Sequence, residues 1–232
     1  VERHDGVARA TQRPDHARIA EELGIEPADQ ITGYRACVFV EGTSDIVFWR
    51  AVARIFRAAG LLDADFEERG IGFMPSGGGT LKHWITMRAL GRLNRRFLAV
   101  MDSDREGEEH PLPEGTLRRQ RACEEQGGAC VILRKREIEN YLHPDALARA
   151  GHGRRPFDDF SDVKAIYDNK RISAAIECMT ADELLTRDRY VDAAGVERHE
   201  LLEIARAMLA LPERGGRRTP RGERHRAEAA LR

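Results

Sequence analysis

Five carboxylates of the sequence stand at or just beyond the ends of apolar runs that have the character of buried strands. They are Glu41, Asp102, Asp104, Glu137 and Glu139. In open parallel sheets, ligands bind outside the carboxyl ends of the strands, so we expect these side chains to face one cleft. Residues two apart in extended chain point the same way, which makes Asp102 and Asp104 a chelating pair. Crowded carboxylates repel one another unless a cation neutralises them, and oxygen ligands suit Mg²⁺ or Mn²⁺.

The chemistry that such a site predicts is an in-line displacement at phosphorus. Two ions about 4 Å apart can activate a water molecule and stabilise the leaving oxygen. Asp45 lies four residues after Glu41, in the first turn of the expected next helix, and could reach a second ion. The alternative interpretation is that Asp45 only complements the dipole at the N-terminus of that helix. Spacing alone favours neither.

The elements that must position these acids are apolar strands alternating with amphipathic helices. The strands are expected at 37–40, 71–74, 97–101 and 130–133, and the helices at about 44–59, 81–89 and 117–125. This alternation predicts an α/β fold, with a parallel sheet of about four strands and helices on both faces. A loop at 76–79 resembles a phosphate-binding nest, but glycines before a helix more often form a tight connection.

The domain organisation predicted from composition has four parts. They are a linker or tail of a preceding domain at 1–34, a catalytic domain at 35–150, a helical extension at 151–211 and a disordered Arg-rich tail at 212–232. A chain of 232 residues is long enough for one such core with flanking pieces.

Bulk composition narrows the class of protein. Thirty-eight Lys and Arg against 39 Asp and Glu give a formal net charge of −1, so any contact with nucleic acid must be local. The four cysteines form no C-x-x-C pair, which argues against structural zinc and a disulfide framework and favours a reducing cytoplasm. The sequence contains no apolar stretch long enough for a membrane span, so we expect no membrane association.

Three segments together resemble the successive motifs of the TOPRIM domain as it occurs in the OLD (overcoming lysogenisation defect) nucleases. They are Val-Glu-Gly-Thr-Ser-Asp at 40–45, Met-Asp-Ser-Asp-Arg at 101–105 and Arg-Glu-Ile-Glu-Asn-Tyr-Leu at 136–142. The resemblance covers about 36–145 and implies a Rossmann-like TOPRIM fold. It also implies that Glu41, Asp102 and Asp104 bind metal, with Asp45, Glu139 and also Glu137 serving a second ion.

The same family resemblance implies a basic residue near the metals, which would stabilise charge on the phosphate. Lys135, Lys164 and Lys170 are the candidates. Lys170 is preferred, because Lys135 follows its strand so closely that it can be interpreted as a solvated strand end. Arg105 could hold a substrate phosphate or pair with a carboxylate of the site.

The sequence therefore predicts a Mg²⁺-dependent (or Mn²⁺-dependent) endonuclease that hydrolyses DNA through a two-metal site. The resemblance implies coupling to an ATPase, in phage defence or DNA processing. No Gly-Lys-Ser/Thr phosphate loop occurs here, so the ATPase is expected in a longer chain or as a separate subunit. Two alternatives stay open, a TOPRIM ribonuclease and a non-catalytic metal- or nucleotide-binding regulatory domain. The oligomeric state is also open, a homodimer included.

Overall fold

The computed structural model describes residues 34–75, 94, 96–168 and 171–213, together with the backbone of a short antiparallel hairpin, β1 (Glu2–His4) and β2 (Val7–Arg9). The helix predicted at 81–89, the glycine loop before it and the tail beyond residue 213 lie outside the described residues, and so does Lys170.

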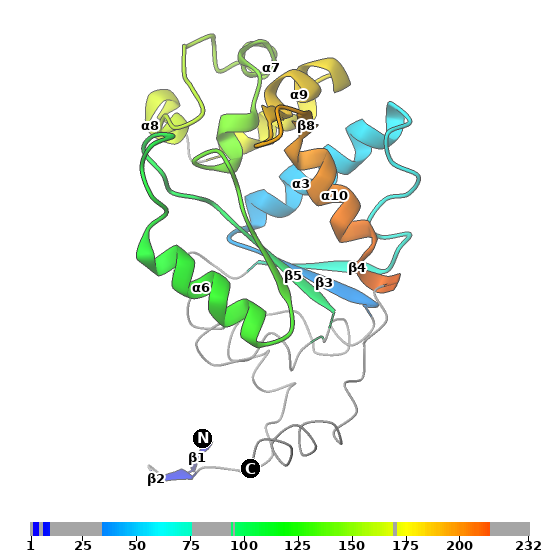
Figure 1. The fold of residues 1–232 in the computed structure, drawn as a ribbon, viewed down its shortest axis with the longest axis vertical. Coiled ribbons are helices and arrows are strands. Elements are labelled where there is room, and N and C mark those ends of the chain that lie inside the picture. The colour runs from blue at the N-terminus through cyan, green and yellow to red at the C-terminus, as the bar shows by residue number, and fades with distance from the viewer. Residues whose placement is uncertain are drawn as a thin grey trace.

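A four-stranded parallel sheet forms the centre of the molecule (Figure 1). Its strands are β3 (Ala36–Val40), β4 (Ile71–Pro75), β5 (Phe97–Met101) and β6 (Ala129–Ile132). They lie in the order β4-β3-β5-β6, and every neighbouring pair is parallel. The predicted α/β class and its parallel sheet are confirmed, because each expected strand occurs within one residue of the predicted position.

Both faces of the sheet are covered, which explains why its strands are apolar without alternation. Ala36, Val38 and Val40 of β3 belong to a large core cluster with helix α3 (Thr43–Ala58). Cys37 and Phe39 belong to a smaller cluster on the other face, which includes Cys123 of helix α6 (Glu114–Glu125). Helices α3 and α6 accordingly lie on opposite sides of the sheet (Figure 1).

The chain after β6 is mostly helical and packs onto α3. Its elements are η1 (Ile138–Tyr141), α7 (Pro144–Arg149), α8 (Val163–Tyr167), η2 (Ile172–Cys178), α9 (Ala181–Asp188), α10 (Glu200–Leu209) and η3 (Leu211–Glu213). Residues of η2 and α10, such as Ile176 and Met208, share the large core cluster with Phe48 of α3. The division at residue 150 stays a prediction, and this one cluster joins both sides of it.

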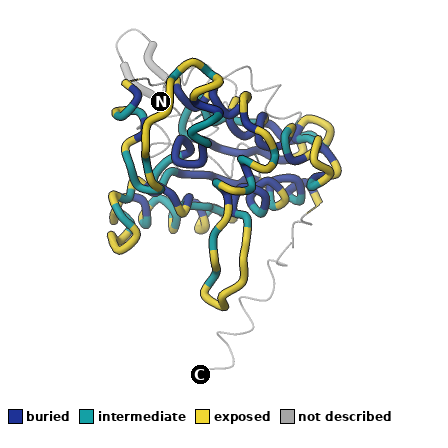
Figure 2. The backbone as a smooth tube through the Cα atoms, turned by 90° about the horizontal axis from the view of Figure 1, so that it is seen from above, coloured by how far each residue is buried: buried dark blue, intermediate teal, exposed yellow. Residues whose placement is uncertain are grey.

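A short antiparallel hairpin interrupts the helices, β7 (Arg189–Val191) paired with β8 (Glu197–His199). The sequence does not predict it, because its strands are short and largely exposed and lack the apolar pattern of a buried strand. Figure 2 shows the buried residues of the sheet and its neighbouring helices enclosed by exposed loops. No helix in the described part of the chain is both long and apolar enough to cross a membrane.

Candidate metal centre

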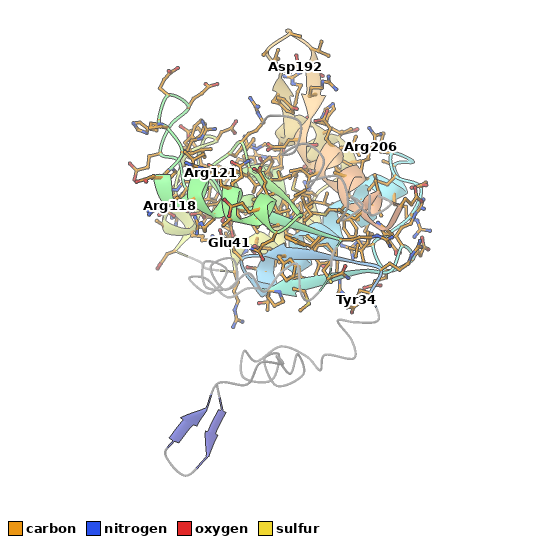
Figure 3. All side chains as sticks on the ribbon, turned by 60° about the horizontal axis from the view of Figure 1, so that its bottom comes forward. Tyr34, Glu41, Arg118, Arg121, Asp192 and Arg206 are labelled. Atoms are coloured by element: carbon orange, nitrogen blue, oxygen red, sulfur yellow. The ribbon has the colours of Figure 1, made fainter. Side chains whose placement is uncertain are left out.

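Glu41 stands at the carboxyl end of β3, and Asp102 and Asp104 follow the adjacent strand β5. Because the two strands are parallel, these acids emerge at the same edge of the sheet. The carboxylate of Glu41 accepts a hydrogen bond from the backbone N–H of Asp102. Burial, reinforced by the negative charges of Asp104 and Asp45, raises the pKa of Glu41 to about 7. Figure 3 labels Glu41 on the ribbon.

Asp102 lies at the centre of this group of acids. Burial raises the pKa of its carboxyl well above the usual range, and the charges of Glu41, Asp45 and Glu139 raise it further. Lys164 acts in the opposite direction and lowers it. Charged residues from four separate segments therefore interact electrostatically with Asp102, as expected for groups arranged around a shared space.

The loop that carries Asp104 is fixed by hydrogen bonds to the segment after β6. The backbone N–H groups of Ser103 and Asp104 both donate to the carbonyl of Arg136, at 3.0 and 3.1 Å. The buried hydroxyl of Ser103 donates to the carbonyl of Lys135 at 2.8 Å. Asp104 has a positive φ of 54°, which is uncommon for a residue other than glycine. The loop is thus bent after Asp102, where the spacing of the two aspartates predicts extended chain.

Asp45 combines both roles that the sequence left open. Its Oδ2 accepts the backbone N–H of Glu41 at 2.9 Å and that of Gly42 at 3.2 Å, so it closes the N-terminal turn of α3. It also lies close enough to Glu41 and Asp102 to raise the pKa of each. Burial raises the pKa of Asp45 itself, while the two backbone donors lower it.

Glu139 enters the group from η1 and is completely buried. Nζ of Lys164 lies 3.1 Å from its Oε2, and hydrogen bonds from this ammonium and from the backbone N–H of Glu139 act to lower its pKa. Burial raises the pKa of Glu139 to about 7. Glu137 lies on the other side of the same ammonium, with its Oε2 2.8 Å from Nζ of Lys164. Glu139 and Glu137 thus share a single ammonium, which leaves negative charge that a cation could balance.

Lys164, from α8, is the lysine that the described part of the chain brings to these acids. Burial by itself would lower its pKa, but the charges of Glu139 and Glu137 outweigh burial and raise it, so the ammonium stays protonated. Lys135 is a buried ion-pair partner of Asp159, at 2.7 Å, and lies against the ring of Tyr141. The interpretation of Lys135 as a solvated strand end is therefore wrong. Lys170, preferred from the sequence, lies outside the described residues.

Two arginines near the site differ from what the sequence suggested. The guanidinium of Arg105 donates to the carbonyls of Glu108 and Arg134, and among the described residues it pairs with no carboxylate. Arg119 carries no signal in the sequence, yet its charge lowers the pKa of Glu41. Arg119 belongs to α6, and only the packing of that helix on the sheet brings it to this edge.

A second group of candidate ligands is also absent from the sequence-based predictions. Single ligand atoms of His143, Asp145 and Glu183 all lie within 4.8 Å of one another, which no other such group in the described residues does. Each acid already has a cation from the chain, however. Arg154 pairs with Asp145, and Arg149 pairs with Glu183 at 2.5 Å and helps to lower the pKa of Glu183 to about 2.

The acids at the sheet edge fit a divalent cation better than this second group does. They are Glu41, Asp45, Asp102, Asp104, Glu137 and Glu139. In the described structure their negative charge is opposed by Lys164, Arg119 and Arg136, which pairs with Glu137 at 3.8 Å. The pKa values of Glu41 and Glu139 are nevertheless raised to about 7. Oxygen donors with uncompensated charge are the set that Mg²⁺ or Mn²⁺ requires.

Comparison with known proteins finds similarity in structure. No protein-family model matches the sequence, and no curated protein is significantly similar to it. The structure is similar to the C-terminal region of the OLD protein of Xanthomonas campestris pv. campestris, with 14% identity and a TM-score of 0.44 over 79% of this chain and 98% of that chain. For the C-terminal region of the Burkholderia pseudomallei OLD protein the identity is 16% and the TM-score 0.43, over 76% of this chain and 99% of that chain. These similarities are similarities of backbone fold. The chemistry of the site depends on the residues of this chain.

Proposed function

We propose that this chain is a Mg²⁺-dependent endonuclease that hydrolyses phosphodiester bonds of DNA. The observation that carries the proposal is that Glu41, Asp102 and Asp104 lie with Asp45 and Glu139 at one edge of the sheet. Among the described residues, fewer cations than acids stand at this edge. A structural ion-pair network of this size would be expected to balance its charges. An excess of carboxylates that are partly or fully buried is instead typical of sites that bind metal ions.

In this proposal Glu41, Asp102 and Asp104 hold one ion, and Asp45 and Glu139, with Glu137, serve a second. Bound ions supply a nucleophilic hydroxide at neutral pH and offset the charge that develops on the phosphate oxygens. Lys164 is the described basic residue of the site, and its protonated ammonium adds positive charge where the phosphate would lie. The hydrogen bonds from the loop at 103–104 to the carbonyl of Arg136 hold the acids of β5 beside Glu137 and Glu139.

The experiment is a cleavage assay on supercoiled plasmid, with a single-stranded RNA in parallel, in Mg²⁺ and in Mn²⁺. We expect Asp102→Asn and Glu41→Gln to lower the rate of nicking by about 10³-fold, because each removes a ligand of an ion that provides several kcal/mol of transition-state stabilisation. The matched control is Glu183→Gln, which neutralises an acid of the other cluster. That variant should cut at a rate close to the wild type.

Two results would contradict the proposal. One is equal activity of wild type and Asp102→Asn. The other is that neither substrate is cut under any of these conditions, also when the ATPase proposed as partner is added. That ATPase is proposed as a domain of a longer chain or as a separate subunit, in a phage-defence or DNA-processing system of the cytoplasm. Cleavage of RNA alone would replace DNA by RNA as the substrate.

A further inference from the structure

A pocket of about 300 Å³ opens beside the proposed metal centre, and the proposed chemistry makes no use of it. Its walls come from the loop after β5, the segment after β6, residues 159–160 and strand β7. The first two of these segments also build the metal centre. Arg105, in the pocket, directly follows Asp104, and Lys135, also in the pocket, stands two residues before Glu137.

Two arginine–aromatic pairs line this pocket. The guanidinium carbon of Arg134 lies 4.2 Å from the ring centroid of Tyr190, and that of Arg105 lies 5.2 Å from the ring centroid of Phe160. A guanidinium that covers an aromatic ring with one face can still stack a planar group on the other. Unpaired nucleic-acid bases bind proteins by such stacking on aromatic rings and guanidinium planes.

Four acids and four bases line the pocket, and three of the acids are engaged by other groups of the protein. Asp159 is paired with Lys135, Glu200 accepts the hydroxyl of Tyr141 at 2.5 Å, and Asp188 accepts the backbone N–H groups of Leu201 and Leu202. Glu108 is the lining acid whose carboxylate has no such partner among the described residues, and it is exposed at the rim.

Two lining arginines have no carboxylate within ion-pair distance among the described residues, although the charge of Arg134 still acts on Glu200 and lowers its pKa. Within the described residues no carboxylate pairs with the guanidinium of Arg134, and that of Arg105 is bonded only to backbone carbonyls. A ligand that matches this lining has a planar ring that can stack and an anionic group that the guanidinium groups can bind.

We infer that this pocket binds one unstacked nucleotide of the substrate strand, next to the phosphate that is cleaved. Its base stacks on the arginine–aromatic pairs, and its phosphate is held by the guanidinium groups. The inference rests on the proposed function, since it takes the nucleic acid cut at the metal centre as the ligand. The inference further requires that the bases of the substrate strand are locally unpaired where the strand contacts the protein.

The test is the binding of a labelled single-stranded oligonucleotide, and of the same sequence as a duplex, by fluorescence anisotropy. Binding is measured in EDTA and again in Ca²⁺, so that the result does not depend on cleavage. Arg134→Ala and Tyr190→Ala should each weaken single-strand binding about tenfold, the usual scale for loss of one stacked base, and weaken duplex binding much less. Tyr190→Phe, which keeps the ring, should bind like the wild type.

The matched control is Arg50→Ala, which removes an arginine of α3 that pairs with Glu67 and does not line the pocket. It should leave binding unchanged, and thermal unfolding of each variant checks that it is folded. Wild-type affinity in both Arg134→Ala and Tyr190→Ala overturns the inference, as does wild-type protein that binds no oligonucleotide. Full rescue by Arg134→Lys also overturns it, because charge alone would then account for binding.

Cleavage separates this inference from the proposed function. If plasmid is cut while Arg134→Ala and Tyr190→Ala bind and cut like the wild type, the pocket fails and the endonuclease stands. If the two variants lose single-strand binding while no variant cuts any substrate, the endonuclease fails, and the pocket stands only as a binding site for an unstacked nucleotide.

Discussion

Two groups of neighbouring carboxylates in the described part of the chain differ in what balances their charge. In the group formed by His143, Asp145 and Glu183, the ligand atoms lie closest together, but arginines pair with both acids and the pKa of Glu183 falls to about 2. At the sheet edge, Glu41 and Glu139 have pKa values raised to about 7. Both are groups of titratable residues, yet the shifts have opposite signs.

This difference shows that close spacing of ligand atoms is a weaker indicator of a metal site than missing countercharge. An arginine held at 2.5 Å from Glu183 already makes the contact that a cation would make. Buried carboxylates without such a partner need an ion or a proton, and raised pKa values express that need. The comparison can be tested by removing the cation of each group, by adding metal, and by changing pH.

Among these three tests, the largest effect is expected from removing the lysine at the sheet edge. Lys164→Ala should lower kcat for plasmid cleavage about 10²-fold, because the variant loses positive charge beside the phosphate. Lys164→Arg should recover part of the activity. The corresponding change in the other group, Arg149→Ala, should leave kcat within about twofold. Steady-state kinetics on the three variants decide this, and full activity of Lys164→Ala would place the basic residue elsewhere in the chain.

Addition of metal should separate the two groups in a measurement that needs no substrate. At a concentration of Mn²⁺ about 100 times the dissociation constant, binding stabilises the folded state by about 2.7 kcal/mol. For a domain of this size that corresponds to a rise in Tm of about 5–10 °C. Glu183→Gln should show the same rise and Asp102→Asn little of it, with EDTA reversing the effect. A rise that is lost in Glu183→Gln would transfer the metal site to the other group.

The smallest effect concerns the pH dependence of stability in the paired group. The pKa of Glu183 falls from its ordinary 4.5 to about 2 in the folded protein, with the hydrogen bond from Arg149 as the largest cause. A depressed folded-state pKa contributes stability above the unfolded value, and this contribution is lost as pH falls through the folded value. Glu183→Gln should therefore be less stable than the wild type by about 1 kcal/mol at pH 7, on the scale of partly exposed ion pairs.

Chemical denaturation at several pH values measures this difference, which should shrink between pH 4.5 and 2. A difference that stays constant over this range would show that the charge of Glu183 contributes nothing. The contact would then be a hydrogen bond that glutamine replaces poorly.

The strands and the acids that follow them were predictable because both depend on short segments. A short continuous apolar run such as 97–101 is typical of a strand covered on both faces, and parallel strands bring their carboxyl ends to one edge. Glu41 and Asp102 can therefore be assigned to one edge from the sequence alone. The hairpin β7–β8 could not be predicted, since its strands carry no apolar pattern.

The sequence by itself determined the class of fold and which acids follow the strands, because apolar periodicity and residue type are local properties. Tertiary structure decided which charged side chains have a partner of opposite charge. It placed Lys164 between Glu137 and Glu139, brought Arg119 toward Glu41 and buried Lys135 against Asp159. These outcomes depend on how helices pack on the sheet, and no spacing along the chain encodes them.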